Sequence, residues 1–350
     1  MTTLDTGALD ALLGRFVADL GATTAAASVV IGHRLGLYRA LADGPLTPEE
    51  LADRTGTHAR PVREWLLGQA AGGYVTATDG GFTLDPQQAF CLADPDGAVY
   101  LPGAFQLALG ALRAEPRVTE SFRTGTGLGW HEHDEDVFLG CEAFFRPGYV
   151  ANVTTTWIPA LGDVEERLRG GGRIADVGCG LGASSIIMAQ AYPAAAVVGS
   201  DYHDGSIAQA RERAEAAAVS DRVSFETASA TTFSGRGYDL VTSFDCLHDM
   251  GDPVAAARHV REAIAPDGCW MLVEPAAADD PRDNLNPVGR MYYGFSTLLC
   301  VPNAESQGGT AVLGAQAGPA ALTKVVTEAG FRRIEKVSGT PFNDVYAVRP

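Results

Sequence analysis

A histidine and an aspartate stand side by side where one apolar run ends. His248 and Asp249 lie in "DCLHDMGDP", directly after "YDLVTSF" at residues 238–244 and just before a Gly-Asp-Pro turn. The unperturbed pKa of histidine, about 6.5, suits a general base at neutral pH. A histidine beside a carboxylate can also bind a metal ion, or the pair could only close a strand and cap the helix that Pro253 opens. The three interpretations stay open until the surrounding elements are known.

A glycine-rich turn is the second candidate for chemistry. Gly178, Gly180 and Gly182 in "DVGCGLG" have no Cβ, so the chain can turn sharply and bring backbone N–H groups close to a ligand. Asp176 precedes the turn, and Asp201 ends the next apolar run, "VVGSD", where a carboxylate could accept hydrogen bonds from ribose hydroxyls. A Gly-Lys-Ser/Thr sequence is missing, which excludes a triphosphate loop. The turn alone fits an NAD site as well as other nucleoside cofactors.

The elements that must position these residues alternate between strands and helices. From about residue 170 the chain reads strand, glycine turn, helix, strand, helix, and continues so to "NDVYAVRP". This alternation predicts an α/β fold with a Rossmann-like doubly wound sheet, in which ligands bind at the carboxyl ends of the strands. Both candidate sites follow such ends.

The first hundred residues have a different pattern. Helical spacing dominates up to "HARPVREWLLGQAAGG", with Thr47, Pro48 and Glu50 forming an expected capping box, and Asp79-Gly80-Gly81 marks a hairpin. Three helices followed by a hairpin are typical of a winged helix. We therefore expect a mainly helical winged-helix domain at residues 1–95, a helical connector at 96–160, and the Rossmann-like domain at 161–350.

Composition narrows the partners. The chain has 350 residues and a formal net charge of −17, which disfavours nucleic acid and anionic membranes. The six cysteines form no C-x-x-C pair, so a cysteine-rich zinc site is not expected. No apolar run approaches the roughly 20 residues that span a bilayer, and the acidic start does not resemble a secretory signal. A cytoplasmic protein is expected.

The motifs together resemble those of class I S-adenosylmethionine-dependent methyltransferases. The resemblance rests on "DVGCGLG", the acid at Asp201, "GYDLVTSFDCLHDMGDP", "LVEP" and "EAGF". With the winged-helix front end, the chain is similar to bacterial small-molecule methyltransferases that also resemble plant phenolic O-methyltransferases. The resemblance implies S-adenosyl-L-methionine as cofactor, a small-molecule acceptor and a homodimer formed through the N-terminal domain. It also implies the following cofactor-binding residues: Asp176, Gly178, Gly180, Gly182, Asp201, Ser229, Phe244 and Asp245.

On the acceptor side the resemblance implies that His248 is the base, with Asp249 beside it and Glu274 orienting it. Two positions depart from the pattern. Ser229 stands where an acid usually accepts a hydrogen bond from adenine, and Gln316 stands where a second acid is common. The resemblance also implies that the connector at residues 96–160 folds over the acceptor pocket, which makes Trp130 and His131 candidates for lining it. Further candidates for lining this pocket are Met291, Tyr292 and Phe295.

Two alternatives to this function remain. Some methyltransferases of α-keto acids resemble this chain and bind a metal ion through a His-Asp pair and a later histidine, which would make this a metal-assisted C-methyltransferase. The matching region here supplies Cys300 but no histidine, so we expect no metal. A winged-helix DNA-binding regulator is the second alternative, but residues 1–100 carry 12 acidic and only 6 basic side chains.

Overall fold

The computed structural model describes residues 4–309 and 311–350, and these residues divide into two compact units. Unit 1 comprises residues up to Leu109 together with Leu139–Pro147, and unit 2 comprises Gly110–Phe138 and Gly148–Pro350. The segment 96–160 expected as a separate connector is thus shared between the two units. Helices α6 (Pro102–Arg113) and α8 (Glu135–Asn152) each contribute residues to both.

Unit 1 has the expected order of helices and hairpin. Its elements are α1 (Thr6–Arg34), α2 (Leu37–Leu41), α3 (Pro48–Thr55), α4 (Ala59–Ala71), β1 (Thr76–Thr78), β2 (Gly81–Thr83) and α5 (Pro86–Leu92). Thr47 and Glu50 form the capping box that starts α3. Strands β1 and β2 pair antiparallel, and Leu46 forms an additional bridge to Phe82. The core of this unit includes Val29, Leu41, Leu51, Leu66 and Val75.

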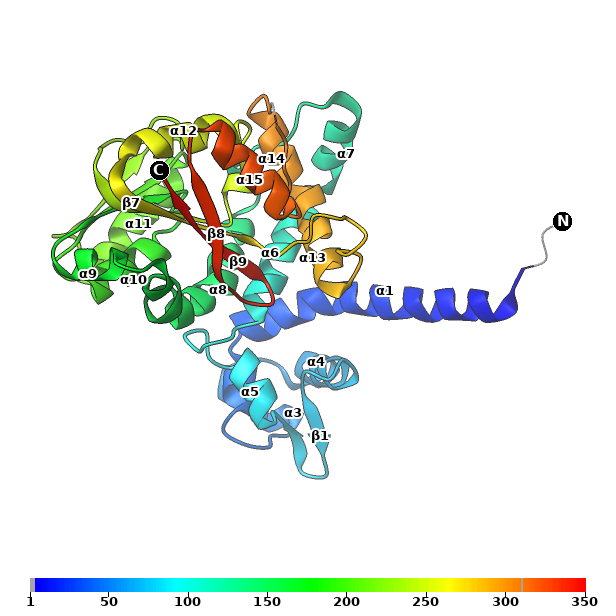
Figure 1. The fold of residues 1–350 in the computed structure, drawn as a ribbon. Coiled ribbons are helices and arrows are strands. Elements are labelled where there is room, and N and C mark those ends of the chain that lie inside the picture. The colour runs from blue at the N-terminus through cyan, green and yellow to red at the C-terminus, as the bar shows by residue number, and fades with distance from the viewer. Residues whose placement is uncertain (1–3, 310) are drawn as a thin grey trace. The chain divides into compact units, whose positions relative to one another are not determined.

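Helix α1 is unusually apolar on its surface. Among the described residues it is the one helix long and apolar enough to cross a bilayer, with 22% of its apolar window buried. A count of uninterrupted apolar residues had missed it because charged side chains such as Asp10, Arg15 and Asp19 interrupt the helix. Figure 1 shows its first half as a straight rod.

Unit 2 contains the doubly wound sheet, in the order β5-β4-β3-β6-β7-β9-β8. Its strands are β3 (Arg173–Val177), β4 (Ala196–Asp201), β5 (Val223–Thr227), β6 (Tyr238–Phe244), β7 (Ile264–Pro275), β8 (Arg333–Gly339) and β9 (Asn343–Arg349). The pairs from β5 to β7 are parallel, while β9 pairs antiparallel with both β7 and β8 (Figure 1). The expected α/β fold is confirmed.

Both faces of this sheet are covered by helices. Successive side chains of a strand point to opposite faces, so neighbours in sequence join different cores. Ile174 packs in a core with α10 (Ala183–Ala191), α11 (Asp204–Ala216) and α9 (Val164–Arg169). Its neighbour Ala175 packs in a second core with α12 (Pro253–Ala263) and α15 (Gly318–Glu328). The remaining helices of unit 2 are α7 (Glu115–Thr124), α13 (Pro287–Phe295), α14 (Val301–Ser306), the 3-10 helices η1 (Trp130–Glu132), η3 (Pro159–Leu161) and η4 (Leu247–Asp249), and the π-helices η2 (Val153–Trp157) and η5 (Ser296–Cys300).

Candidate active site

The glycine turn joins β3 to α10 and leaves free space on one side. Gly178, Gly180 and Gly182 have φ angles of 76°, 52° and 82°, a region that residues with a Cβ rarely adopt. A Cβ at Gly178 would lie 2.8 Å from the sulfur of Cys246, whereas a Cβ at Gly180 would meet no atom within 4 Å. The turn therefore packs against Cys246, just after β6, and leaves open space beside Gly180.

Asp176 lies beneath this turn and is completely buried. Its Oδ2 accepts hydrogen bonds from the hydroxyls of Ser184 and Ser185, both at 2.6 Å, and its Oδ1 accepts one from Thr242 at 2.8 Å. Burial raises the pKa of Asp176, and the three hydroxyls partly offset that rise. The carboxylate braces the start of α10 against β6, and its predicted contact with a cofactor stays a prediction.

Asp201, at the end of β4, is fastened to the same turn. Its Oδ2 accepts a hydrogen bond from the backbone N–H of Gly180 at 3.0 Å, and its Oδ1 accepts one from His203 at 2.9 Å. Burial raises the pKa of Asp201, while the two N–H donors lower it. Two of the predicted cofactor residues are thus brought together at adjacent carboxyl ends of strands. Ser229 follows β5, and its hydroxyl lies 2.9 Å from those of both Thr231 and Thr232.

Phe244 and Asp245 end β6 in different environments. Phe244 is buried against the rings of Tyr149 and Trp157. Asp245 has a φ of 50°, uncommon for a residue other than glycine, and its Oδ1 accepts a hydrogen bond from Asn343 at 2.6 Å. Its Oδ2 is buried without a hydrogen-bond partner among the described residues, and burial raises its pKa well above the usual value. A buried oxygen without a hydrogen-bond partner calls for an explanation, and the contact of Asp245 with a cofactor stays a prediction.

His248 lies in η4, two residues after the cysteine that packs on the glycine turn. Its Nδ1 donates a hydrogen bond to Oε2 of Glu274, which lies near the end of β7. The other oxygen of Glu274 accepts the backbone N–H of Leu247 at 2.9 Å, so the carboxylate holds both the ring and its backbone. Both His248 and Glu274 are buried. The structure therefore brings together the two residues expected to be the base and its orienting acid.

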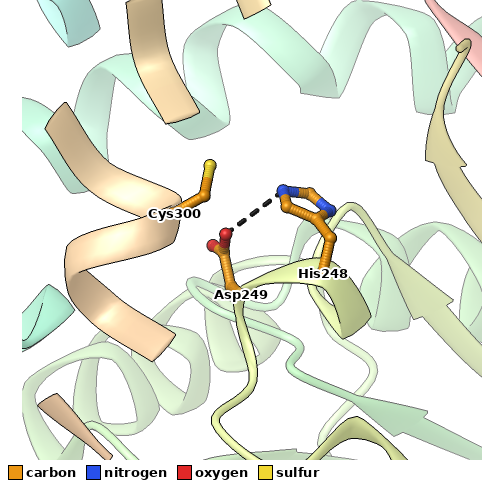
Figure 2. Close-up of side chains that lie close together, drawn as sticks. All are labelled: His248, Asp249 and Cys300. Atoms are coloured by element: carbon orange, nitrogen blue, oxygen red, sulfur yellow. Dashed lines mark ion pairs between the residues drawn. The ribbon is translucent and has the colours of Figure 1, made fainter. Parts of the chain in front are cut away.

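The second ring nitrogen faces another carboxylate. Nε2 of His248 lies 3.1 Å from Oδ1 of Asp249, as the dashed line in Figure 2 shows. The two atoms form an ion pair when the ring is protonated. Oδ1 of Asp249 is buried and has no hydrogen-bond partner among the described residues. Burial by itself would lower the pKa of His248, but the carboxylates of Glu274 and Asp249 outweigh it and raise the pKa well above 6.5.

Comparison with known proteins identifies the two parts of the chain. The family profile described as a methyltransferase domain matches residues 168–329, which include the glycine turn, Asp201, His248 and Glu274. Residues 168–329 are a methyltransferase domain. The profile described as an Rv2258c-like winged HTH domain matches residues 23–93.

Individual relatives are similar to different extents of the chain. The 27-O-demethylrifamycin SV methyltransferase of Amycolatopsis mediterranei is 31% identical over 131 residues, which are 35% of this chain and 48% of that protein. The mitomycin biosynthesis 6-O-methyltransferase of Streptomyces lavendulae is 25% identical over 80% of this chain and 81% of that protein. For the first four curated relatives, by contrast, the match spans about half or less of the relative's own length. Human N-acetylserotonin methyltransferase, solved with S-adenosylmethionine, shares the fold with a TM-score of 0.67 at 15% identity, covering 100% of this chain and 99% of that one.

Cys300 is the residue of the methyltransferase domain that sequence reasoning left out of the site. It ends η5, is buried, and its sulfur lies with His248 and Asp249 in a group whose ligand atoms are all within 4.8 Å of one another (Figure 2). No spacing rule joins a cysteine in one helix to a histidine fifty residues earlier in another element. Only the packing of η5 against η4 brings them together.

The predicted pocket residues divide into two groups. Tyr292 is buried in α13, and its hydroxyl donates a hydrogen bond to the backbone carbonyl of Phe342 at 2.7 Å. Burial, followed by the charge of Asp245, raises the pKa of Tyr292. Met291 and Phe295 are half-buried on the same helix. The ring of His131 instead makes a T-shaped contact with the ring of Tyr202. Tyr202 follows Asp201, the acid predicted to bind ribose.

Trp130 and Gln316 complete the positions named from the sequence. The backbone N–H of Trp130 donates to Asn303, whose side-chain amide in turn donates to the carbonyl of Asp249 at 3.0 Å. Gln316 donates to the backbone carbonyls of Ala315 and Ala276 and lines a separate pocket of about 440 Å³ between α7, α13 and η5. The side-chain N–H group of Gln316 is therefore bonded to backbone, and among the described residues Glu274 is the hydrogen-bond partner of Nδ1 of His248.

Proposed function

We propose that this protein transfers a methyl group from S-adenosylmethionine to a hydroxyl oxygen of a small natural-product-type acceptor. The observation that carries the proposal is the pairing of His248 with Glu274 beside a glycine turn tied to Asp201. The chain carries a methyltransferase domain. One similar protein is named 27-O-demethylrifamycin SV methyltransferase, and another is named mitomycin biosynthesis 6-O-methyltransferase.

The residues fit the cofactor. Gly180 presents a bare backbone to free space, Asp201 ends the neighbouring strand, and Asp245 offers a buried oxygen without a partner among the described residues. These three would hold the methionine and ribose ends. When bound, S-adenosylmethionine supplies a methyl group on a cationic sulfur, so the methyl carbon itself needs no activation.

The chain's own task is to take the proton of the acceptor hydroxyl. In the proposed step the acceptor oxygen forms a bond to the methyl carbon, the carbon–sulfur bond breaks, and the hydroxyl proton moves to Nε2 of His248. Glu274 on Nδ1 and Asp249 beside Nε2 stabilise the imidazolium that results. Only the neutral ring can take this proton, and the two carboxylates raise the pKa of His248, which favours its charged form.

Cofactor binding is the first test. Titration calorimetry with S-adenosylhomocysteine should show one site per chain, and Asp201→Asn should weaken binding about tenfold or more, since hydrogen bonds to a charged group contribute about 1.5–3 kcal/mol. Asp221→Asn changes an exposed acid in the loop before β5 and serves as the control. Absence of heat with the wild-type protein would remove the proposal.

We further propose a cytoplasmic homodimer formed through unit 1. Large apolar side chains on the first half of α1 are 40–67% exposed, namely Leu9, Leu12, Leu13, Phe16, Val17 and Leu20. Leu9, Leu13, Phe16 and Leu20 recur at spacings of four, three and four residues, which is the pattern of a helix–helix seam. The acidic charge of the chain supports the expectation that the winged helix does not bind nucleic acid.

A further inference from the structure

His248, Asp249 and Cys300 present three different kinds of metal ligand to one point. An imidazole nitrogen, a carboxylate oxygen and a thiol sulfur come from η4 and η5, with all ligand atoms within 4.8 Å of one another. Figure 2 shows the three side chains converging. Two ligand atoms that each lie about 2.0–2.2 Å from a tetrahedral zinc ion are about 3.3–3.6 Å apart. The observed separation of 3.1 Å between Nε2 of His248 and Oδ1 of Asp249 is slightly shorter than that range.

The surroundings of the histidine resemble those of a metal ligand. A metal-bound histidine almost always donates its other N–H to a carboxylate, which orients the ring. Nδ1 of His248 has that partner in Glu274, and Glu274 is itself held by the backbone N–H of Leu247. Asp249 is held through its carbonyl by Asn303 and Gln307. Its Oδ1 remains buried without a hydrogen-bond partner among the described residues.

We infer that His248, Asp249 and Cys300 form a binding site for one zinc-class divalent transition-metal cation. A thiolate and an imidazole favour such an ion over Mg²⁺ or Ca²⁺, which prefer oxygen ligands. Three protein ligands leave the fourth position of a tetrahedral ion for water or substrate, the arrangement of catalytic rather than structural zinc sites.

The catalytic consequence of this site rests on the proposed function, whereas cation binding does not. A cation on Nε2 would occupy the position that the hydroxyl proton otherwise takes. An acceptor hydroxyl bound at the fourth position would then lose its proton to water more readily, as metal-bound water does. Methyl transfer would still form the carbon–oxygen bond and break the carbon–sulfur bond.

Cobalt(II) provides a readout that does not depend on activity. We expect chelator-treated full-length protein to bind one Co²⁺ per chain and to develop a near-ultraviolet thiolate-to-cobalt charge-transfer band. Zn²⁺ should displace the band. Cys300→Ser should lose it, and Glu274→Gln should weaken Zn²⁺ affinity roughly 10–100-fold, as the loss of a carboxylate behind a metal-bound histidine does.

Cys91→Ser is the matched control, because Cys91 is a half-buried free cysteine in α5 of unit 1. It should keep the full band. The inference fails if wild-type protein binds no cobalt or binds it without a thiolate band, an outcome that does not require any variant to fold. It also fails if folded Cys300→Ser keeps the band. Calorimetry with S-adenosylhomocysteine on the same metal-free protein separates these failures from a failure of the proposed methyl transfer.

Discussion

At the scale of single residues, the site is governed by how two carboxylates surround one imidazole. Glu274 occupies Nδ1 of His248 and Asp249 faces Nε2, and together they raise the pKa of the ring above 6.5 although burial would lower it. A raised histidine pKa means that the charged form contributes stability below the unfolded pKa of about 6.5 and that this contribution is lost as pH rises through the folded pKa. The same shift means that the neutral form of His248, the form that can act as a base, becomes populated only at higher pH.

The pH dependence of the metal-free enzyme follows from the upward shift of the His248 pKa. Activity should rise with pH through the raised pKa of His248, because only the neutral ring can take a proton. Glu274→Gln removes one of the charges that raise the pKa, so the rising limb of kcat should move to lower pH. The measurement is kcat against pH for both proteins in the presence of chelator. If kcat of Glu274→Gln rises over the same pH range as in the wild type, His248 is not the base whose titration controls activity.

Removal of the ring is the more severe change. His248→Ala should lower kcat about 10²–10⁴-fold, the usual contribution of a general base. Its affinity for S-adenosylhomocysteine should stay close to wild type, since His248 is not among the predicted cofactor ligands. Calorimetry and single-turnover methyl transfer measure the two quantities separately. A variant that retains more than about a tenth of the rate would leave alignment of the reactants as the source of catalysis.

At the scale of elements, the β3–α10 turn was readable from sequence because glycine is the signature of its backbone. Asp176, Gly178 and Asp201 could be placed near one another once strands were expected to be parallel, and the structure joins Gly180 to Asp201 directly. The hydrogen bonds that Asp176 accepts from Ser184, Ser185 and Thr242 could not be predicted, since small hydroxyl residues are common on buried helices and strands. Cys300 was missed because its approach to η4 is a matter of packing between helices.

Substitution of Gly180 tests the turn, because a control glycine separates the effect of filling the proposed cofactor space from the effect of backbone strain. A Cβ at Gly180 meets nothing within 4 Å, so Gly180→Ala should cost only about 1–2 kcal/mol of backbone strain while its methyl group enters the proposed cofactor space. Gly237→Ala has a similar strain at φ 71° and equally open surroundings, but lies in the loop before β6. Affinity for S-adenosylhomocysteine should fall in the first variant and not in the second. Equal affinities would place the cofactor elsewhere.

At the scale of the whole molecule, the sequence predicted two kinds of folding unit but not how the middle of the chain is shared. The strand–helix alternation after residue 170 and the helix–hairpin order before residue 92 were both strong local patterns, and both are present. Residues 96–160 lack such a pattern and are divided between the units, with α8 contributing to each. Local periodicity identifies a helix but does not say which core it joins.

The exposed face of α1 belongs to this largest scale, because an apolar helix surface needs a partner. If the partner is a second copy, Phe16→Glu should convert a dimer into a monomer by placing a charge in the seam formed with Leu13 and Leu20. Light scattering coupled to gel filtration measures the mass directly. Leu285→Glu is the control, since Leu285 is 77% exposed in unit 2, outside α1. A monomeric wild-type protein, or one that floats with lipid vesicles through α1, would show that this face serves another purpose.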